Sequence, residues 1–297
     1  MVYKSVEELD FELSSQAPNP IPQKVLMTSP AHFDVKYVIN PHMEGHIGTI
    51  DTVKAWEQWK ALKQAYEAIG VDTHQLEGVE GYPDMVFCAN QALPFYAGSN
   101  ESPGIILSNM HADQRKGEVK HIGEFFSRQG YTLHSVQTNN GSDFEGMGDA
   151  IWHPGHKLLW GGYGYRTDLN IYEKIAQLLD INVIALELSS ADFYHLDTCF
   201  SVLTPQAVMI YPGAFTKQSL DLIYHVFEQV IACPEDESRE LFACNAHCPD
   251  QKHVIIQRGC TETVRMLQEA NFIPIEVDTS EFLKSGGSVF CMKQMFW

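Results

Sequence analysis

Residues 169–211 read LNIYEKIAQLLDINVIALELSSADFYHLDTCFSVLTPQAVMIY, and this stretch decides the fold. Its beginning, residues 169–179, has apolar side chains at the spacing of an amphipathic helix. The apolar run INVIALEL follows at once and predicts a strand, and a second β-rich run begins at Phe200. A polar segment with His195 and Asp197 lies between the two runs. The stretch therefore predicts one structural unit: helix, strand, polar segment and second strand.

The same order recurs along the chain. Amphipathic helices are predicted near residues 52–69, 117–129, 169–179, 218–231 and 261–270. Four of these helices lead into a clear β-rich run, whereas residues 233–245, after the fourth, lack an obvious strand. A recurrence at very roughly 50 residues indicates a repeated supersecondary unit.

Polar residues that could do chemistry recur with the same spacing, just after each helix–strand element. They are Asp84 and Asn90, then Glu145 and Asp149, then His195 and Asp197, then Asn245, and finally Cys291. Equivalent positions of repeated units meet at a common axis if the units close into a ring. We therefore predict a single closed α/β domain over residues 27–297, with strands inside, helices outside and a central site, preceded by a polar extension at residues 1–26. An open α/β sheet is the alternative, but it does not explain the recurrence.

Composition and charge restrict the possible partners. The chain has 297 residues and a formal net charge of -18, which argues against a nucleic-acid partner and mildly favours a cationic substrate. The sequence has no signal-peptide pattern and no apolar run near the roughly 18 residues that a membrane span needs. Its seven scattered cysteines indicate free thiols in a reducing compartment, so we expect a cytoplasmic protein.

Two segments offer a nucleophile and an acid–base group. Cys291 follows a glycine pair on a predicted short apolar strand, although a lone cysteine is usually a buried inert thiol. Strand alternation would place His195, Asp197 and Cys199 on one face, where the imidazole could serve as general acid or base and the carboxylate could hold a cation. A purely structural histidine–aspartate pair is the alternative interpretation.

Two further segments supply carboxylates. Glu145 and Asp149 share strand parity, and the glycines between them leave room for a ligand, although a turn with solvated acids would look the same. Asp84 leads into an apolar strand that also carries Asn90, and a buried charge there needs a partner. The CNAHC motif at 244–248 lacks a second Cys/His pair, so we predict no metal and no cofactor.

Taken together, these segments resemble the guanidino-group-modifying enzyme superfamily, which includes arginine deiminases, dimethylarginine dimethylaminohydrolases and amidinotransferases. The arginine dihydrolase branch is the closest match. The resemblance is carried by HFDVKYVINPHMEG (32–45), PDMVFCAN (83–90), FEGMGDA (144–150), GYGYRTD (162–168), FYHLDTCF (193–200), IYPGAF (210–215), FACN (242–245) and FLKSGGSVFCM (282–292). It implies a five-bladed, pseudo-symmetric α/β propeller with the active site at its axis.

The resemblance also implies roles for individual residues. Cys291 matches the nucleophile and His195 the general acid/base. Glu145 matches a carboxylate that grips guanidinium nitrogens, and Asp197 matches a second such carboxylate. The implied chemistry is attack of a thiolate on the guanidinium carbon to form a covalent thiouronium.

The remaining matches concern the substrate. By resemblance, Asp84 is an acid near the site, Arg166 holds the substrate carboxylate and Asn40 belongs to a loop on the substrate side. Asn90 stands where deiminases carry an Asp, as it does in dihydrolases, which favours removal of both nitrogens. Asn109 stands where relatives have an arginine, so one anchor for a substrate carboxylate is missing, and only the nearby Arg115 could replace it.

These matches predict a hydrolase that converts arginine to ornithine, ammonia and carbon dioxide. Three enzymatic alternatives stay open: a deiminase, a dimethylarginine dimethylaminohydrolase, or an amidinotransferase acting on another guanidine such as agmatine or protein-bound arginine. A guanidine-binding protein without turnover is the alternative from another class. We expect a small guanidino substrate, no nucleic-acid or membrane partner, and leave a homo-oligomer open.

Overall fold

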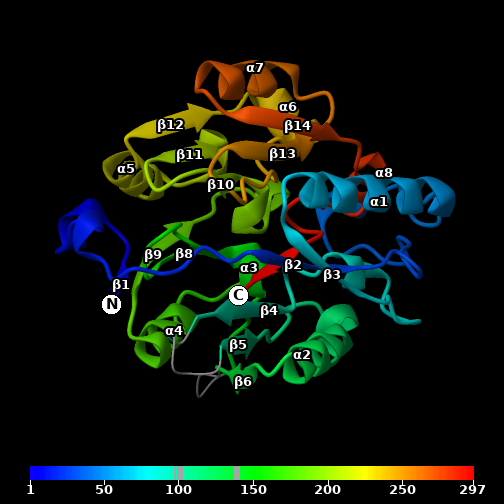
Figure 1. The fold of residues 1–297 in the computed structure, drawn as a ribbon, viewed down its shortest axis with the longest axis horizontal. Coiled ribbons are helices and arrows are strands. Elements are labelled where there is room, and N and C mark those ends of the chain that lie inside the picture. The colour runs from blue at the N-terminus through cyan, green and yellow to red at the C-terminus, as the bar shows by residue number, and fades with distance from the viewer. Residues whose placement is uncertain (97, 99–102, 137–140) are drawn as a thin grey trace.

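A computed structural model describes residues 1–96, 98, 103–136 and 141–297. In that part of the chain the strands form five sheets arranged around a common centre, with the long helices on the outside (Figure 1). The predicted five-bladed α/β propeller is therefore confirmed. Because the sheets surround the axis, each one can contribute side chains to a single central site.

The sheets share one pairing pattern, in which a first strand runs antiparallel to a second and the second runs parallel to a third. The first three sheets are β15(Gln294–Phe296), β2(Lys24–Thr28) and β3(Asp72–Leu76); β4(Ala92–Phe95), β5(Gly104–Leu107) and β6(Thr132–Ser135); and β7(Ala150–Trp152), β8(Leu158–Tyr163) and β9(Asn182–Glu187). The other two are β10(Phe200–Val202), β11(Ala207–Ile210) and β12(Gln229–Ala232), and the pair β13(His253–Gln257) and β14(Ile273–Val277). In the last sheet, a single antiparallel bridge from His247 to Ile255 stands in place of the first strand.

The long helices form the outer layer. They are α1(Thr52–Ala68), α2(Val119–Arg128), α4(Ile171–Leu179), α5(Lys217–Val226) and α7(Thr261–Glu269). Four of them pack against the third strand of their own unit, as α1 does against β3. Local sequence explains the ends of α1: the Asp51 side chain accepts hydrogen bonds from the first-turn backbone, and Gly70 follows the helix with a φ of 83°.

Short turns precede the first strands of the sheets, where the sequence predicted continuous strands. They include the 3-10 helix Pro83–Val86, α3(Gly146–Asp149), the 3-10 helix Leu196–Thr198 and the bend before Cys291. The strand-alternation argument was therefore wrong for His195 and Glu145, and Cys291, expected on a short strand, lies in a turn before β15. One physical reason is local: the Thr198 hydroxyl donates to the His195 carbonyl over 2.7 Å, and such a bond competes with strand pairing.

The fourth unit differs from its prediction in a second way. The helix expected near 218–231 ends at Val226, and residues Gln229–Ala232 form β12, which pairs in parallel with β11. Pairing with a neighbouring strand thus outweighs the helical pattern of the sequence. The fourth unit, in which the sequence showed no obvious strand at residues 233–245, therefore has its strand a few residues earlier.

The C-terminal strand pairs with a strand from early in the chain. The C-terminal strand β15 pairs antiparallel with β2, which closes the ring (Figure 1). The short helices α6(Glu235–Glu240) and α8(Ser280–Leu283) and the strand β1(Val2–Tyr3), which pairs with β9, complete the fold. The division at residue 26 stays a prediction. No helix in the described ranges has both the length and the apolar character to cross a membrane.

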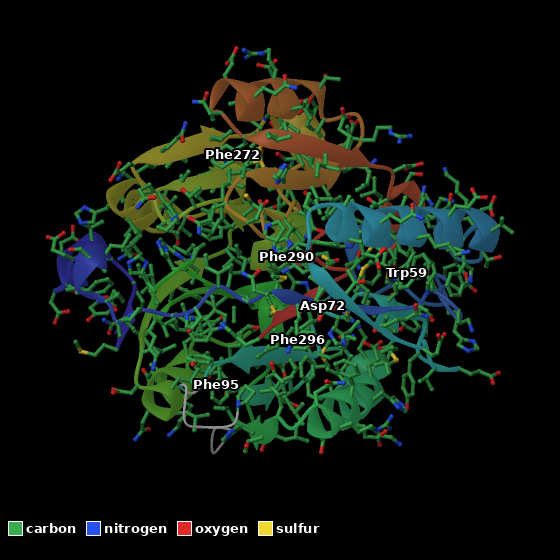
Figure 2. All side chains as sticks on the ribbon, viewed as in Figure 1. Trp59, Asp72, Phe95, Phe272, Phe290 and Phe296 are labelled. Atoms are coloured by element: carbon green, nitrogen blue, oxygen red, sulfur yellow. The ribbon has the colours of Figure 1, made fainter. Side chains whose placement is uncertain are left out.

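Side chains fill the space between sheets and helices. Figure 2 shows Phe290, one residue before Cys291, near the middle of the molecule, where it is buried. The bend before β15 is therefore packed from several directions, and the functional group that it carries has a fixed position.

Candidate active site

A small cavity lies where the turns before the first strands converge. Six of the residues predicted from the sequence line it: Asn40, Asp84, Asn90, Arg166, His195 and Cys291. Glu145 and Asp197 lie directly behind, each bonded to a residue of the wall. The structure therefore brings all eight predicted residues to one place.

The thiol of Cys291 is held between an acid and an amide. Its Sγ donates to Asp197 Oδ2 over 3.2 Å, and Asn245 Nδ2 lies 3.2 Å from the same sulfur. Asn245 also fixes the bend, because its Oδ1 accepts from three backbone N–H groups, including that of Cys291. Sequence reasoning saw Asn245 only as a recurring position; its place in FACN, equivalent to those of Asp84 and His195 in their units, was the available signal.

Burial and Asp197 together keep this sulfur protonated. Burial is the largest effect and raises the pKa of Cys291 well above its usual value, and the adjacent Asp197 carboxylate adds to it. Burial likewise raises the pKa of Asp197 to about 7. Asp197 Oδ1 has no hydrogen-bond partner among the described residues. A bound cation would donate hydrogen bonds to that oxygen, and its charge would favour the thiolate of Cys291 and the carboxylate of Asp197.

The imidazole of His195 is oriented by Glu145. His195 Nε2 donates to Glu145 Oε2 over 2.5 Å, while Glu145 Oε1 accepts from the backbone N–H of His111 over 3.0 Å. Burial opposes ionisation of Glu145, but the hydrogen bond and charge of His195, with help from Arg166, hold the pKa of Glu145 at about 2. Both oxygens of Glu145 accept from protein donors, and its bond to Nε2 fixes the orientation of the His195 ring.

Arg115 is buried and donates to several groups of the protein itself. It is 4% exposed, forms an ion pair with Glu118 at 2.9 Å and donates Nη1 to Asn90 Oδ1 over 2.9 Å. Its Nη2 also donates to the backbone carbonyls of Asp84 and Phe87. The sequence left open whether Arg115 replaces the missing anchor, and these contacts show that it is used within the protein.

Asn109 does not contribute to the cavity. Its side chain donates to the Ser142 carbonyl over 2.9 Å, and it is absent from the cavity wall. The residue that stands where relatives have an arginine therefore makes a contact within the protein and does not face the cavity.

Arg166 remains as a cation on the cavity wall next to the N-terminal loop. Its Nη2 donates to the Ile39 carbonyl over 2.6 Å, and its guanidinium lies 4.8 Å from the centre of the Tyr194 ring. Asn40 donates to the Ser285 carbonyl, and the Tyr194 hydroxyl donates to the carbonyl of Gly286. The loop is thus tied across the cavity to the glycine segment that precedes Cys291.

The donor set of the site does not suit a metal ion. Arg115, Arg166 and three amide or thiol groups dominate the wall. Across the described ranges, no group of three or more His, Cys, Asp or Glu side chains is arranged to hold an ion. The site instead combines a nucleophile, an oriented imidazole and unsatisfied polar atoms around a small space.

Comparison with known proteins identifies relatives over nearly the whole chain. Residues 42–296 match the sequence model of the family described as N,N dimethylarginine dimethylhydrolase, eukaryotic. The bifunctional arginine dihydrolase/ornithine cyclodeaminase of Synechocystis is 36% identical over 91% of this chain and 37% of its own length. The dimethylarginine dimethylaminohydrolase of Mycobacterium tuberculosis is 33% identical over 92% of this chain and 85% of its own. The chain thus spans little more than a third of the length of the bifunctional relative from Synechocystis, and most of the length of the relative from Mycobacterium tuberculosis.

Solved structures that resemble this chain come from the same two kinds of enzyme as its sequence relatives. The N-terminal domain of a cyanobacterial arginine dihydrolase, bound to its substrate, superposes with a TM-score of 0.85 at 34% identity, covering 92% of this chain and 97% of that domain. Another structure of the same domain is covalently bound to a reaction intermediate. A dimethylarginine dimethylaminohydrolase superposes with a TM-score of 0.76 at 24% identity over 93% of this chain and 100% of its own, which supports the shared fold.

Proposed function

The chain belongs to the guanidino-group-modifying superfamily, in its arginine dihydrolase branch, and we propose that it hydrolyses L-arginine to ornithine, ammonia and carbon dioxide. One observation carries the proposal. Cys291 and His195 face a small cavity in which buried polar atoms of Asp197 and Asn90 lack partners within the described chain. A planar cation with several N–H groups would satisfy the carboxylate among them.

Binding of the substrate begins with charge. The Asp197 carboxylate, beside the sulfur, accepts guanidinium N–H groups, and Asp84 faces the same cavity. Arg166 reaches the α-carboxylate of the substrate after giving up its contact with the Ile39 carbonyl. Because Asn109 and Arg115 are engaged elsewhere, Arg166 is the anchor in this scheme, and its loss should weaken arginine binding far more than agmatine binding.

The first chemical step is attack of Cys291 on the guanidinium carbon. The bound cation lowers the pKa of the thiol, whose proton passes to its hydrogen-bond acceptor, Asp197 Oδ2, and from there to solvent. The thiolate sulfur bonds to carbon, and the departing amino group takes a proton from His195 and leaves as ammonia. Glu145 stabilises the protonated imidazole throughout, since its carboxylate stays ionised. His195 then removes a proton from water, which attacks the covalent thiouronium.

The orientation of Asn90 supports removal of the second nitrogen. Arginine side chains only donate hydrogen bonds, so the Asn90 carbonyl oxygen must face Arg115 and the amide N–H₂ must face the other way. That Nδ2 is buried, lacks a partner in the described chain and lies close to Gly148 and His195. A donor there suits the carbonyl oxygen of the ureido product, whereas an aspartate would present only acceptors. The half-hydrolysed product is therefore held for a second cycle.

Product analysis tests this proposal. Purified protein incubated with L-arginine should release two ammonia molecules for each ornithine, with little free citrulline. The Cys291→Ser variant should release neither. Release of ammonia and citrulline in equal amounts would identify a deiminase, and failure to consume arginine, agmatine or methylated arginines would exclude guanidine hydrolysis.

Dimethylarginine hydrolysis is the second candidate, favoured by the family match over residues 42–296 and by the full-length relative from Mycobacterium tuberculosis. Dimethylamine release from asymmetric dimethylarginine, faster than ammonia release from arginine, would establish it. We also propose a cytoplasmic location, which the seven unpaired cysteines support. A homo-oligomer stays a prediction.

A further inference from the structure

A second cavity, of about 80 Å³, lies behind the segment that carries the nucleophile. Phe290 and Lys293 line it, whereas Cys291, between them in the chain, lines the active-site cavity. The two cavities share no lining residue, so this short segment separates them. Figure 2 places Phe290 near the middle of the molecule, which puts the inner end of the second cavity close to the propeller axis.

The inner end of this cavity carries an unsatisfied amine. Lys293 is 0% exposed, and its Nζ has no hydrogen-bond partner within the described residues. The amine lies over the Phe290 ring, whose centre is 3.2 Å from Nζ. An amine buried without an acceptor carries a desolvation cost that an oxygen ligand would offset.

The walls define what ligand would fit. Most are apolar, with Ile151, Trp152, Val202 and Met295 among them, and no Asp or Glu lines the cavity. His247 also lines it, and burial followed by the charge of Lys293 keeps the pKa of His247 well below its usual value, so this imidazole is neutral. Burial lowers the pKa of Lys293 to about 7, while the charge of Asp197, which does not line this cavity, acts to raise it. A single anionic group in the cavity therefore meets one amine and no carboxylate on the wall, and the rest of the ligand meets hydrocarbon.

We propose that this second cavity binds a small monocarboxylate with an apolar tail, with the carboxylate on the Lys293 amine and the tail along Trp152 and Val202. A phosphate or other dianion fits less well, because only one amine faces it and the walls are apolar. A purely apolar ligand would leave the amine unsatisfied. The site is distinct from the guanidinium site, so it does not depend on the proposed reaction.

Binding of hexanoate to the protein tests the site. Cys291 is first alkylated, so that the active-site cavity cannot account for binding, and affinity is measured by calorimetry and by the shift in unfolding temperature. We expect hexanoate to bind at least about tenfold more tightly than 1-hexanol, since the carboxylate gains a charge-assisted hydrogen bond.

Variants assign the binding to this cavity. Lys293→Met should remove the preference for hexanoate over hexanol, whereas Lys120→Met, at an exposed lysine on α2, should not. Val202→Phe narrows the cavity while keeping Lys293, and it should lower the affinity for both hexanoate and 1-hexanol. This variant also tests the site if Lys293→Met fails to fold. Undetectable hexanoate binding, or binding that both cavity variants leave unchanged, would mean that the cavity holds only water and would overturn the proposal.

Discussion

At the scale of single residues, the reactivity of the site depends on the charge beside one sulfur. Cys291 donates to Asp197, and burial together with that carboxylate raises the pKa of the thiol. The resting enzyme therefore holds a thiol, and a cationic substrate creates the thiolate that attacks it. The acidic neighbour suppresses reaction with neutral electrophiles and admits a cation.

Replacing this acid should move reactivity and turnover in opposite directions. In Asp197→Asn the negative charge is gone, so the pKa of Cys291 falls and more thiolate exists at a given pH. Alkylation of the unliganded enzyme by neutral iodoacetamide at pH 8 should rise about tenfold, which corresponds to one pKa unit. Turnover of arginine should fall by about 100-fold or more, because the guanidinium loses its partner.

The pH profile of alkylation supplies the control. The rate should rise with pH in every variant, and the rising limb of Asp197→Asn should lie at lower pH than that of the parent enzyme. Asp113→Asn, at an exposed acid paired with Lys116, should leave the profile unchanged. If the alkylation rate of Asp197→Asn rises over the same pH range as that of the parent enzyme, the role given to this carboxylate is wrong.

The pair Arg115 and Asn90 should decide the product. Asn90→Asp presents acceptors to the cavity, so citrulline should accumulate at the expense of ornithine. Arg115→Lys keeps the charge but loses the Nη1 donor that orients the amide, so it should shift the ratio in the same direction. The ratio is measured by mass spectrometry of the products.

The double variant separates orientation from general damage. In the Asn90→Asp background, Arg115→Lys should change the product ratio no further, although it can slow turnover. Lys116→Arg, at the neighbouring exposed position, serves as the matched control. An unchanged ratio in Arg115→Lys alone would contradict the positioning role while leaving the proposed reaction intact.

At the scale of elements, the short turns before the first strands shape the site. Gly148 in α3 sits so close to Asn90 that a Cβ would lie 2.2 Å from Nδ2. Gly148→Ala should therefore displace the amide and reduce kcat about tenfold or more, with a small change in unfolding temperature. Gly123→Ala in α2, where a Cβ meets Leu107 at 3.4 Å, is the control and should keep full activity. Equal activity in both variants would show that Asn90 tolerates displacement.

The same elements show what the sequence could and could not predict. The periodic helices and the recurrence of polar residues predicted the closed ring and six of the eight site residues, because both depend on local pattern. Arg166 and Asn40 were expected only from the family resemblance. The turn at Leu196–Thr198 was missed because one hydroxyl contact decides it. The partners of Arg115 were missed because the contacts to Asn90 and the Phe87 carbonyl join segments that are more than 20 residues apart.

At the scale of the whole molecule, closure of the ring connects stability to catalysis. Strand β15 pairs with β2, and Gln294 Nε2 donates to the Ala92 carbonyl over 2.6 Å, only three residues beyond Cys291. The position of the sulfur therefore depends on the contacts that the C-terminal strand makes with β2 and Ala92.

Removing residues 294–297 tests the importance of closure. The truncated protein should unfold at least about 10 °C below the parent and lose activity, since it loses β15 and the core contacts of Phe296. Removing residues 1–3 takes away β1, which lies at the outer edge of another sheet, and should lower the unfolding temperature by less. Equal unfolding temperatures for the parent and the C-terminal truncation would show that the ring is stable without this closure.

The most direct test of the account is the mass of the protein quenched during turnover of L-arginine. If Cys291 attacks the guanidinium carbon, the peptide carrying Cys291 should gain the mass of arginine less one ammonia, and Cys291→Ser should gain nothing. Turnover of arginine with no adduct at Cys291 at any quench time, or undiminished turnover in Cys291→Ser, would contradict it.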